Sequence, residues 1–499
     1  MKFHDLKLQL SILALLSFSY CIVSCSDNSD EDVKTENTDD SGDNGSDSGD
    51  GSDDGNGGSD NGGSDNGGSS GGDSQGEPME PQEQKEKLDA IACDFLKQIP
   101  ASDFQNLKYD LEDLNLSYYA NDYDWEGVEE WASNAFEDCR EAIGQTTERE
   151  EYDYGYGYVY TYECVYDNYK AILLASNFTG KFTAKNGRWR RTDASNLQFE
   201  IPEENCLLTL TTSGNVKKVY AFNLDDWKDY SYDYENDISK EYYDRTQCTI
   251  GVPEKIEVTL KVDGVNLIKT TINIKLSDIT SERFDIAKSS VSVTTTTELN
   301  NGYKFNFSEL KYAGNNNVAI STSVSKNSKA LLTTTLSSKI ENIPHYNADV
   351  FADDDDYDMN DFDNANGRDT YAKIDLMGRL QLQGKITNIR KFVDYLNLAD
   401  EHDDDQSTFK SYINQANSLM KVNMYFDNTS TKQASLKLEP LYEDGGYWDY
   451  SRWIAEPVIV FDDNSSYSNF EAFFNEDDFS NAIDALKKLS ERYEDLLED

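Results

Sequence analysis

Histidine, basic residues and long apolar runs are all scarce in this chain of 499 residues. There are 45 Lys and Arg against 95 Asp and Glu, so the formal net charge is −50 at pH 7. A surface this acidic repels phosphodiester backbones, which excludes nucleic acid as an expected partner. The long apolar run is confined to residues 8–23, so a protein with several membrane spans is excluded as well.

The scarcity of histidine also limits the chemistry that the chain can perform. After residue 25 the histidines are His345 and His402, and neither shows the spacing of a zinc site or of a Ser-His-Asp arrangement. The many carboxylates include no pair that the sequence singles out for glycoside hydrolysis. We therefore predict a protein that is not an enzyme and has no cofactor.

Cysteines are few and do not form a metal or redox motif. Those after residue 25 are odd in number and include no CxxC pair. Cys139 and Cys206 fall on apolar faces of the predicted elements, which favours buried free thiols, with one or two disulfides as the alternative. The residues concerned are Cys93, Cys139, Cys164, Cys206 and Cys248.

The N-terminus has the pattern of a secretory signal peptide over residues 1–24: two lysines, an apolar run and a small residue before Cys25. The residues Ile22-Val23-Ser24-Cys25 resemble the lipobox of bacterial lipoproteins, which implies that Cys25 is the acylated mature N-terminus. Cys21 suits this role less well because the bulky Tyr20 precedes it. The alternative is an ordinary signal peptide followed by a coincidental Cys.

The segment after Cys25 is acidic and of low complexity. The run Ser26–Asp32 resembles the surface-export signal of Bacteroidetes lipoproteins, which implies an outer-membrane lipoprotein that faces the cell exterior, with a periplasm-facing protein as the alternative. Residues 25–81 are rich in Gly, Ser, Asp and Asn and have no apolar face to bury, so they are expected to form a disordered tether. The membrane is thus the expected partner, through the lipid on Cys25.

Hydrophobic periodicity divides the rest of the chain. Apolar residues recur every three or four positions over 82–99 and 125–143, which predicts two amphipathic helices within an N-terminal helical segment, 82–150. Over 151–386 the period is two, with turn residues at Asn186-Gly187, Gly214-Asn215, Asp263-Gly264 and Asn301-Gly302, which predicts antiparallel hairpins.

The C-terminal region, 387–499, mixes helices and short strands. Helical patterns cover about 388–398, 408–420 and 478–497. Strands that alternate apolar and polar residues form a sheet with one apolar face, which these helices are expected to cover. The expected fold class is α+β: a large twisted antiparallel β-meander, with a half-barrel as one form it could take, packed against several amphipathic helices.

Tyrosines mark a candidate binding surface. Seven of them share one parity, so a continuous strand presents a row of phenols on one face, either to stack on sugar rings or to pack within the protein. Further clusters extend this platform only where the fold brings them together. The row is Tyr152, Tyr154, Tyr156, Tyr158, Tyr160, Tyr162 and Tyr166, and the clusters are Tyr230, Tyr232, Tyr234 and Tyr447, Trp448, Tyr450, Trp453.

An Asp-rich stretch over 349–369 is the candidate cation site. Aspartates are the ligands that Ca²⁺ prefers, but their spacing here does not match an EF-hand in the registers that begin at these residues. Starting at Asp354, position six is Met359 and position twelve is Ala365. A solvated loop is the favoured interpretation, and Ca²⁺ is the alternative.

Two functions follow from these patterns. The one-sided strands over 178–386 resemble, in architecture only, lipid-carrying lipoproteins with half-barrel folds, which implies a non-enzymatic binding protein for an apolar or amphipathic molecule. The alternative is a surface glycan-binding or adhesive module that uses exposed Tyr and Trp. A pocket of several hundred Å³ on the apolar face favours the first, and a fully covered face favours the second.

Overall fold

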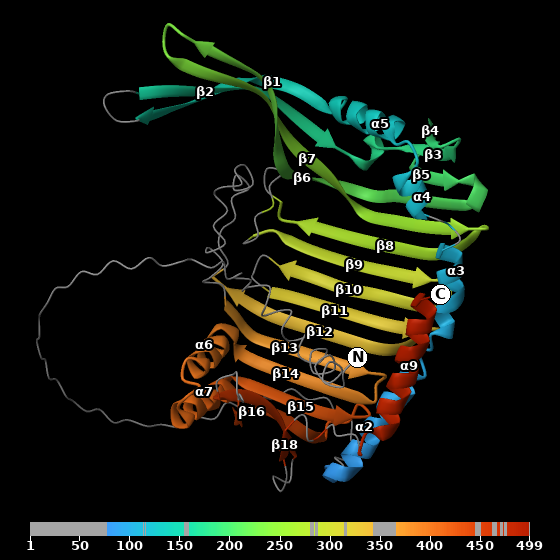
Figure 1. Ribbon diagram of the computed structural model, residues 1–499, viewed down its shortest axis with the longest axis vertical. Coiled ribbons are helices and arrows are strands. Elements are labelled where there is room, and N and C mark those ends of the chain that lie inside the picture. Colours follow the sequence, from blue (N-terminus) through green and yellow to red (C-terminus); the bar gives the residue numbers. More distant parts are fainter. Residues whose placement is uncertain are drawn as a thin grey trace, which may run out of the picture. The chain divides into compact units, whose positions relative to one another are not determined.

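A computed structural model of the protein is shown in Figure 1. It describes residues 77–498 except 113, 115, 154–158, 280–283, 285–287, 314–316, 343–365, 445–450, 462–466, 470–472 and 474–476. The chain divides into residues 1–76 and a compact unit, Glu77–Asp499. The signal peptide, Cys25 and most of the expected tether lie outside the described residues, and the compact unit is considered by itself below.

The N-terminal part of this unit is helical, as predicted, but with more and shorter helices. The first predicted helix is confirmed and ends at Leu96. The second ends at Glu137, so its predicted extension to residue 143 is wrong, because Arg140–Asp153 forms a strand whose backbone groups pair with the next strand. The helices are α2 (Pro81–Leu96), α3 (Ser102–Glu112), α4 (Leu116–Asn121) and α5 (Glu126–Glu137).

One sheet of 18 strands forms the body of the unit. The first strands are β1 (Arg140–Asp153), β2 (Val159–Leu173), β3 (Gly180–Lys185), β4 (Arg188–Thr192), β5 (Leu197–Ile201), β6 (Cys206–Asp233), β7 (Ile238–Val262), β8 (Val265–Ser277) and β9 (Ser290–Leu299). The others are β10 (Tyr303–Ala313), β11 (Asn317–Lys326), β12 (Lys329–Glu341), β13 (Asn366–Leu376), β14 (Leu380–Asn388), β15 (Met420–Phe426), β16 (Lys432–Glu443), β17 (Arg452–Phe461) and β18 (Tyr467–Asn469).

The predicted antiparallel meander is confirmed from β5 to β18, where each strand pairs antiparallel with the next one in sequence. The sheet as a whole is mixed, however, because β2 pairs parallel with β7 and β3 pairs parallel with β5. The outer parts of β6 and β7 extend past β8 and pair with each other, β7 also pairs with β2, and β2 pairs with β1 (Figure 1). We call these four paired segments, 140–153, 159–173, 216–233 and 238–250, the arm.

Most of the predicted turns are confirmed by their backbone conformation. Asn186-Gly187 and Asp263-Gly264 join hairpins with positive φ at both residues, a region that Asn, Asp and Gly enter at low cost. Gly302 closes the β9–β10 hairpin in the same way. The predicted turn at Gly214-Asn215 is wrong: these residues lie inside β6, where Gly214 takes its positive φ at an irregularity opposite β7.

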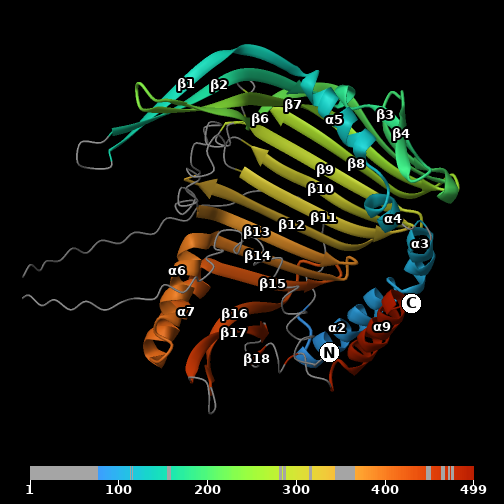
Figure 2. The same ribbon diagram turned by 45° about the horizontal axis from the view of Figure 1, so that its top comes forward.

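The predicted C-terminal helices are present as α6 (Ile389–Asp400), α7 (Gln406–Leu419) and α9 (Ser480–Glu498). Side-chain caps begin two of them: Asn388 accepts from the Lys391 amide and Asp405 from the Ser407 amide. α9 lies beside α2 (Figure 2), because Asp89 of α2 accepts hydrogen bonds from residues 481 and 482 at the start of α9. The α6–α7 pair and the α2–α9 pair each pack on the sheet.

Candidate functional site

One face of the sheet is apolar over most of its width. Cross-strand partners point to the same face, so the pairing register traces that face from strand to strand. Moving from β17 to β8, the line of partners consists almost entirely of apolar residues. It runs through Ile459, Leu436, Val422, Gly384, Ala372, Leu336, Ile320, Leu310, Val293 and Ile274. We call the side to which these residues point the apolar face.

The opposite side, which we call the polar face, carries short hydroxyl, amide and charged side chains. A line of partners on it runs through Thr271, Thr296, Asn306, Ser323, Thr333 and Asp375. Asn306 connects its neighbours, since its Oδ1 accepts from Thr296 and its Nδ2 donates to Ser323. The alternation seen in the sequence therefore separates the two faces as predicted.

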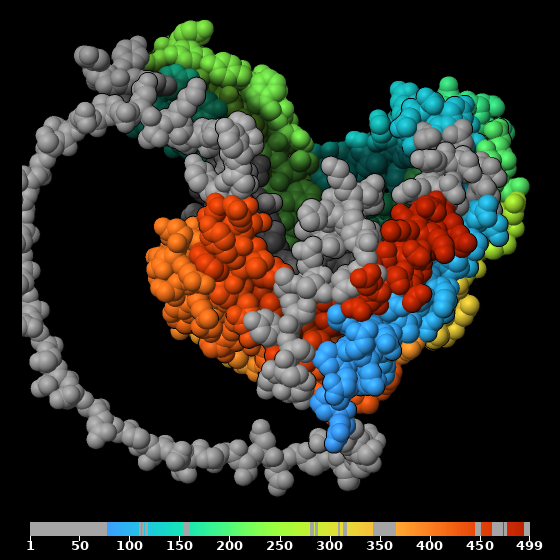
Figure 3. All heavy atoms as spheres, turned by 60° about the horizontal axis from the view of Figure 1, so that its bottom comes forward, coloured from blue at the N-terminus to red at the C-terminus, as the bar shows by residue number. Residues whose placement is uncertain are grey.

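Over β13–β17, helices cover the apolar face near both ends of the strands. At one side Leu88 and Ile91 of α2 pack with Phe426, Ile459 and Phe461. At the other side α6 and α7 pack with apolar residues of β16 and β17, with Phe409 and Ile413 at the centre of the contact. Figure 3 shows the α6–α7 pair and the α2–α9 pair on opposite sides of this face.

A third cluster covers the β3–β6 end. Phe182 and Trp189 are buried there beneath residues of α4 and α5, including Tyr119 and Trp131. The aromatic rings lie at close range, with the Trp131 and Phe182 centroids 4.9 Å apart. This end of the sheet is therefore a closed core and leaves no room for a ligand between these rings.

Helix α3 contacts the ends of β10 and β11 at Tyr303 and Lys326, but no helix of the described residues covers the rest of the middle of the apolar face, over β8–β12 (Figures 1 and 2). Phe305 is 40% exposed there. Tyr303 and Tyr312, towards the two ends of β10, are buried, whereas most of the other apolar side chains that point to this face are only half-buried. They include Ile272, Ile274, Leu276, Val291, Val293, Phe307, Leu310, Val318, Ile320, Val324, Leu332 and Leu336.

Threonine hydroxyls interrupt this apolar surface. The Oγ1 atoms of Thr270 and Thr297 lie 3.0 Å apart, and those of Thr322 and Thr334 lie 2.6 Å apart. A hydroxyl can donate one hydrogen bond and accept two, so each pair keeps capacity for a further partner. The middle of the apolar face thus combines branched aliphatic side chains with hydrogen-bonding groups.

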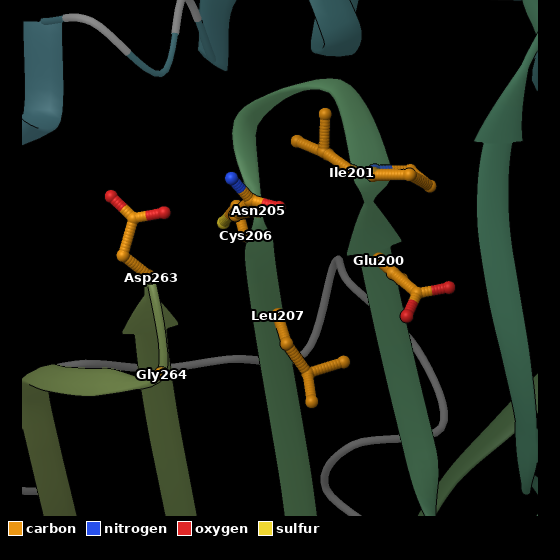
Figure 4. A pocket seen from close by; sticks show the side chains of 8 residues that line it. Glu200, Ile201, Asn205, Cys206, Leu207, Asp263 and Gly264 are labelled. Carbon is orange, nitrogen blue, oxygen red and sulfur yellow. The ribbon is translucent and has the colours of Figure 1, made fainter.

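A hollow of about 550 Å³ lies elsewhere, at the ends of β5, β6 and β7 (Figure 4). Its lining consists mainly of polar and turn residues, namely Glu200, Ile201, Pro202, Asn205, Cys206, Leu207, Asp263 and Gly264. None of them belongs to β9–β12, so this hollow is not part of the half-buried middle of the apolar face. Its position at open strand ends gives it no convergent set of functional groups.

The arm carries the second candidate site, on the continuation of the polar face. Tyr243 is an odd-numbered residue of β7, whereas Ile256 and Val258, on the same strand, are even-numbered and point to the apolar face. Tyr243 is paired with Tyr166 of β2 and with Trp227 of β6. We call this side of the arm the aromatic arm face; it comprises Tyr152, Tyr160, Tyr162, Tyr166, Trp227, Tyr230, Tyr232 and Tyr243.

An arginine orders one end of the aromatic arm face. The Arg245 guanidinium lies 3.5 Å from the Tyr166 ring centroid, and it donates to Glu148 at 2.7 Å and to Asp225 at 3.1 Å. Tyr166 also stacks on Tyr243, with their centroids 5.5 Å apart. Burial raises the pKa of the Tyr166 phenol above its ordinary range, so this ring stays neutral.

A carboxylate fixes the neighbouring phenols. The Tyr243 hydroxyl donates to Glu241, and a hydrogen bond from Tyr162 to Glu241 is the first cause of a lowered pKa for this carboxyl. The same bond from Tyr243 raises the pKa of that phenol to about 12. Glu241 is therefore charged and the phenols are neutral at pH 7, which keeps their rings in place.

The structure brings some of the aromatic residues predicted from the sequence together, and others lie elsewhere or outside the described residues. It brings Tyr230 and Tyr232 onto the same face as the Tyr152–Tyr166 row, which the sequence did not show. Trp227 and Tyr243 were missed. Trp227 differs in parity from Tyr230 and Tyr232, and an irregularity of β6 between Trp227 and Asp229 brings it onto their face. Trp453 lies apart, against Tyr442 and the α6–α7 core. Tyr154, Tyr156, Tyr158, Tyr447, Trp448, Tyr450, His345 and the Asp-rich stretch up to residue 365 lie outside the described residues.

The cysteines after residue 25 are free thiols, as predicted. Cys206 and Cys248 are buried, and Cys164 lies on the aromatic arm face between Tyr162 and Tyr166. Burial raises the pKa of all five thiols, which keeps them protonated and unreactive at pH 7. His402 is likewise structural, with its Nδ1 2.9 Å from the Leu398 carbonyl oxygen.

No three His, Cys, Asp or Glu side chains within the described ranges are grouped to hold a metal ion. In the same ranges, every helix is too short or too polar to cross a bilayer. No protein-family model matches the chain, and no curated protein and no solved structure shows significant similarity to it.

Proposed function

We propose that this protein is a lipid-anchored binding protein without enzymatic activity, and that the middle of its apolar face takes an apolar or amphipathic molecule. The supporting observation is the set of half-buried aliphatic side chains over β8–β12, together with Phe305, which is 40% exposed. Large contiguous apolar surfaces are rare on a monomer unless they bind something. In this proposal the sheet curls as a half-barrel around the ligand.

The composition of the face favours an amphipathic ligand over a purely apolar one. The Thr270–Thr297 and Thr322–Thr334 hydroxyl pairs lie between aliphatic rows and can hydrogen-bond a polar group. The aliphatic rows bury the apolar part, at about 25 cal/mol per Å² removed from water. Such a surface resembles the usual small-molecule site, which is mostly apolar with a few placed polar groups.

The N-terminal pattern supports the location in this proposal. Acylation at Cys25 anchors the chain to the outer membrane, and the acidic run Ser26–Asp32 directs it to the cell exterior. Proteinase added to intact cells then removes the compact unit. Complete protection until the outer membrane is breached places the protein in the periplasm instead.

Ligand retention after gentle purification tests the binding proposal. Native mass spectrometry of the wild-type protein is expected to show a bound species that organic solvent extracts. Leu336→Lys places a charge on the apolar face and is expected to abolish retention. Thr335→Lys, one residue away on the polar face of the same strand, is the matched control and retains the ligand. A wild-type protein that is ligand-free and does not take up a fatty acid or phospholipid probe contradicts the proposal.

A further inference from the structure

We propose that the aromatic arm face is a second binding site, separate from the apolar face, and that its ligand is an uncharged glycan. Trp227 and Tyr230 supply rings for stacking, and the carboxylates beside them accept hydrogen bonds from sugar hydroxyls. This site goes beyond the function proposed above, since it lies on the opposite side of the sheet. The two proposals can therefore fail independently.

The arm aligns its aromatic side chains across adjacent strands. Tyr166, Tyr243 and Trp227 are direct partners on β2, β7 and β6. Because adjacent strands are about 4.8 Å apart, the row spans about 10 Å. One row further along, Tyr230 is paired with Glu241, and its hydroxyl lies 2.8 Å from the Ser239 Oγ atom. The pairing thus places these rings on one side of the arm, in neighbouring rows.

The outer rings of this surface are strongly exposed. Trp227 is 60% exposed and Tyr230 is 49% exposed. Tyr152, at the far side of the arm on β1, is 49% exposed. Large aromatic rings in water are costly, whereas the C–H groups of a sugar ring can lie flat on their electron-rich faces. The inner rings, Tyr166 and Tyr243, hold the surface in shape.

Polar groups beside the rings are already oriented. Glu148 and Asp225 are held by Arg245, and Glu241 by two phenols. A carboxylate has about four acceptor positions, so each keeps capacity for ligand hydroxyls after these contacts. Because the acceptors are fixed before binding, a ligand with several hydroxyls loses little side-chain entropy when it binds.

The charges on this face select the class of ligand. Arg245 pairs with Glu148 and Asp225, and Glu150 and Glu241 add further negative charge to the same face, which makes the surface around the rings unfavourable for a polyanion. The carboxylates also make it unfavourable for a lipid chain. A cationic ligand is disfavoured as well, because the Arg245 guanidinium already lies over the buried Tyr166 ring, 3.5 Å from its centroid. An uncharged ligand rich in hydroxyl groups fits all three conditions.

The experiment measures binding of the full-length chain, purified without its lipid, to soluble β-glucan, α-mannan and galactomannan by affinity electrophoresis and calorimetry. At least one of these neutral glycans is expected to bind. Trp227→Ala and Tyr230→Ala are each expected to weaken that binding at least tenfold. Leu224→Ala is the matched control: Leu224 lies on the same strand but on the opposite face, since it pairs with Thr246, it is 36% exposed, and its replacement leaves binding unchanged.

Ionic strength separates this ligand class from the others. Binding of an uncharged glycan is expected to change less than twofold between 50 and 500 mM salt, whereas binding of a charged ligand falls steeply. The proposal is overturned if no neutral glycan binds, or if Trp227→Ala and Leu224→Ala bind equally well. Salt-sensitive binding of heparin or of a lysine-rich peptide, without binding of a neutral glycan, also overturns it. Leu336→Lys, which tests the apolar face, leaves glycan binding intact.

Discussion

The buried phenol of Tyr303 joins the first helices to the meander, and its removal gives a quantitative test of the fold. Tyr303 is 2% exposed, and its hydroxyl lies 2.8 Å from both the Gln98 carbonyl oxygen and the Asp103 Oδ2 atom. Lys326 of β11 reaches the same carboxylate. Burial, followed by the bond to Asp103, raises the pKa of the phenol, so it donates throughout the physiological range.

Tyr303→Phe removes the hydroxyl but keeps the ring that packs on Phe104, with the two centroids 4.8 Å apart. A hydrogen bond to a charged acceptor contributes about 1.5–3 kcal/mol, and the Gln98 carbonyl also loses its phenol partner. Because Asp103 keeps Lys326, we expect a loss of about 2 kcal/mol in the free energy of unfolding. The assay is urea denaturation, with amide hydrogen exchange to locate the change in α3.

Tyr118→Phe is the matched control, since Tyr118 is 43% exposed and its hydroxyl is expected to contribute less than about 0.5 kcal/mol. A cycle of Tyr303→Phe with Asp103→Ala is expected to show a coupling energy of about 0.5–3 kcal/mol, as for residues in one hydrogen-bonded network. If Tyr303→Phe costs no more than the control, or if the two sites are additive, the structural reasoning about this junction is refuted.

Three further predictions concern other parts of the chain. Gly251→Ala places a Cβ against the Leu174 Cδ2 atom and 2.8 Å from the Val216 Cγ1 atom, where β7 leaves β2, and thermal unfolding is expected to show a loss of about 1–3 kcal/mol in the free energy of unfolding. Gly127→Ala in α5 meets only an ordinary 3.7 Å contact and is expected to stabilise by about 0.5–1 kcal/mol, so equal effects at both sites contradict the geometry. Mass spectrometry of the N-terminal peptide is expected to show an acylated Cys25, and an unmodified Cys25 or cleavage elsewhere disproves it. The pKa is raised to about 12 at Tyr119, first by burial, and at Tyr243, first by its bond to Glu241. A raised phenol pKa stabilises the fold fully below the unfolded value of about 10, and this contribution is lost as the pH rises through 12. Absorbance titration at alkaline pH measures it, and two phenols that titrate near pH 10 in the folded protein rule it out.

The sequence by itself determined the features that depend on local repetition. Alternation with a period of two assigns most residues of β8–β14 to one face, so the apolar and polar faces can be read from parity except across irregularities such as the one between Phe307 and Leu310 in β10. The helices α6 and α7 were predictable because Asn388 and Asp405 stand at their N-termini with apolar residues at helical spacing behind them. Asn186-Gly187 and Asp263-Gly264 likewise predicted hairpin turns, because the positive φ of such a turn depends on the turn residues themselves.

Tertiary structure alone decided the contacts between segments far apart in the chain. The parallel pairing of β2 with β7 puts Tyr166 beside Tyr243, and the β6–β7 pairing adds Trp227. Nothing in the local pattern of β2 specifies its partner, because any strand with suitable side chains satisfies its backbone hydrogen bonds. Gly214-Asn215 shows the same limit, since an apparent turn is absorbed as an irregularity inside β6 once the paired β7 continues past it. Which strands meet depends on the free energy of burying the whole sheet, and that quantity is not local to any stretch of sequence.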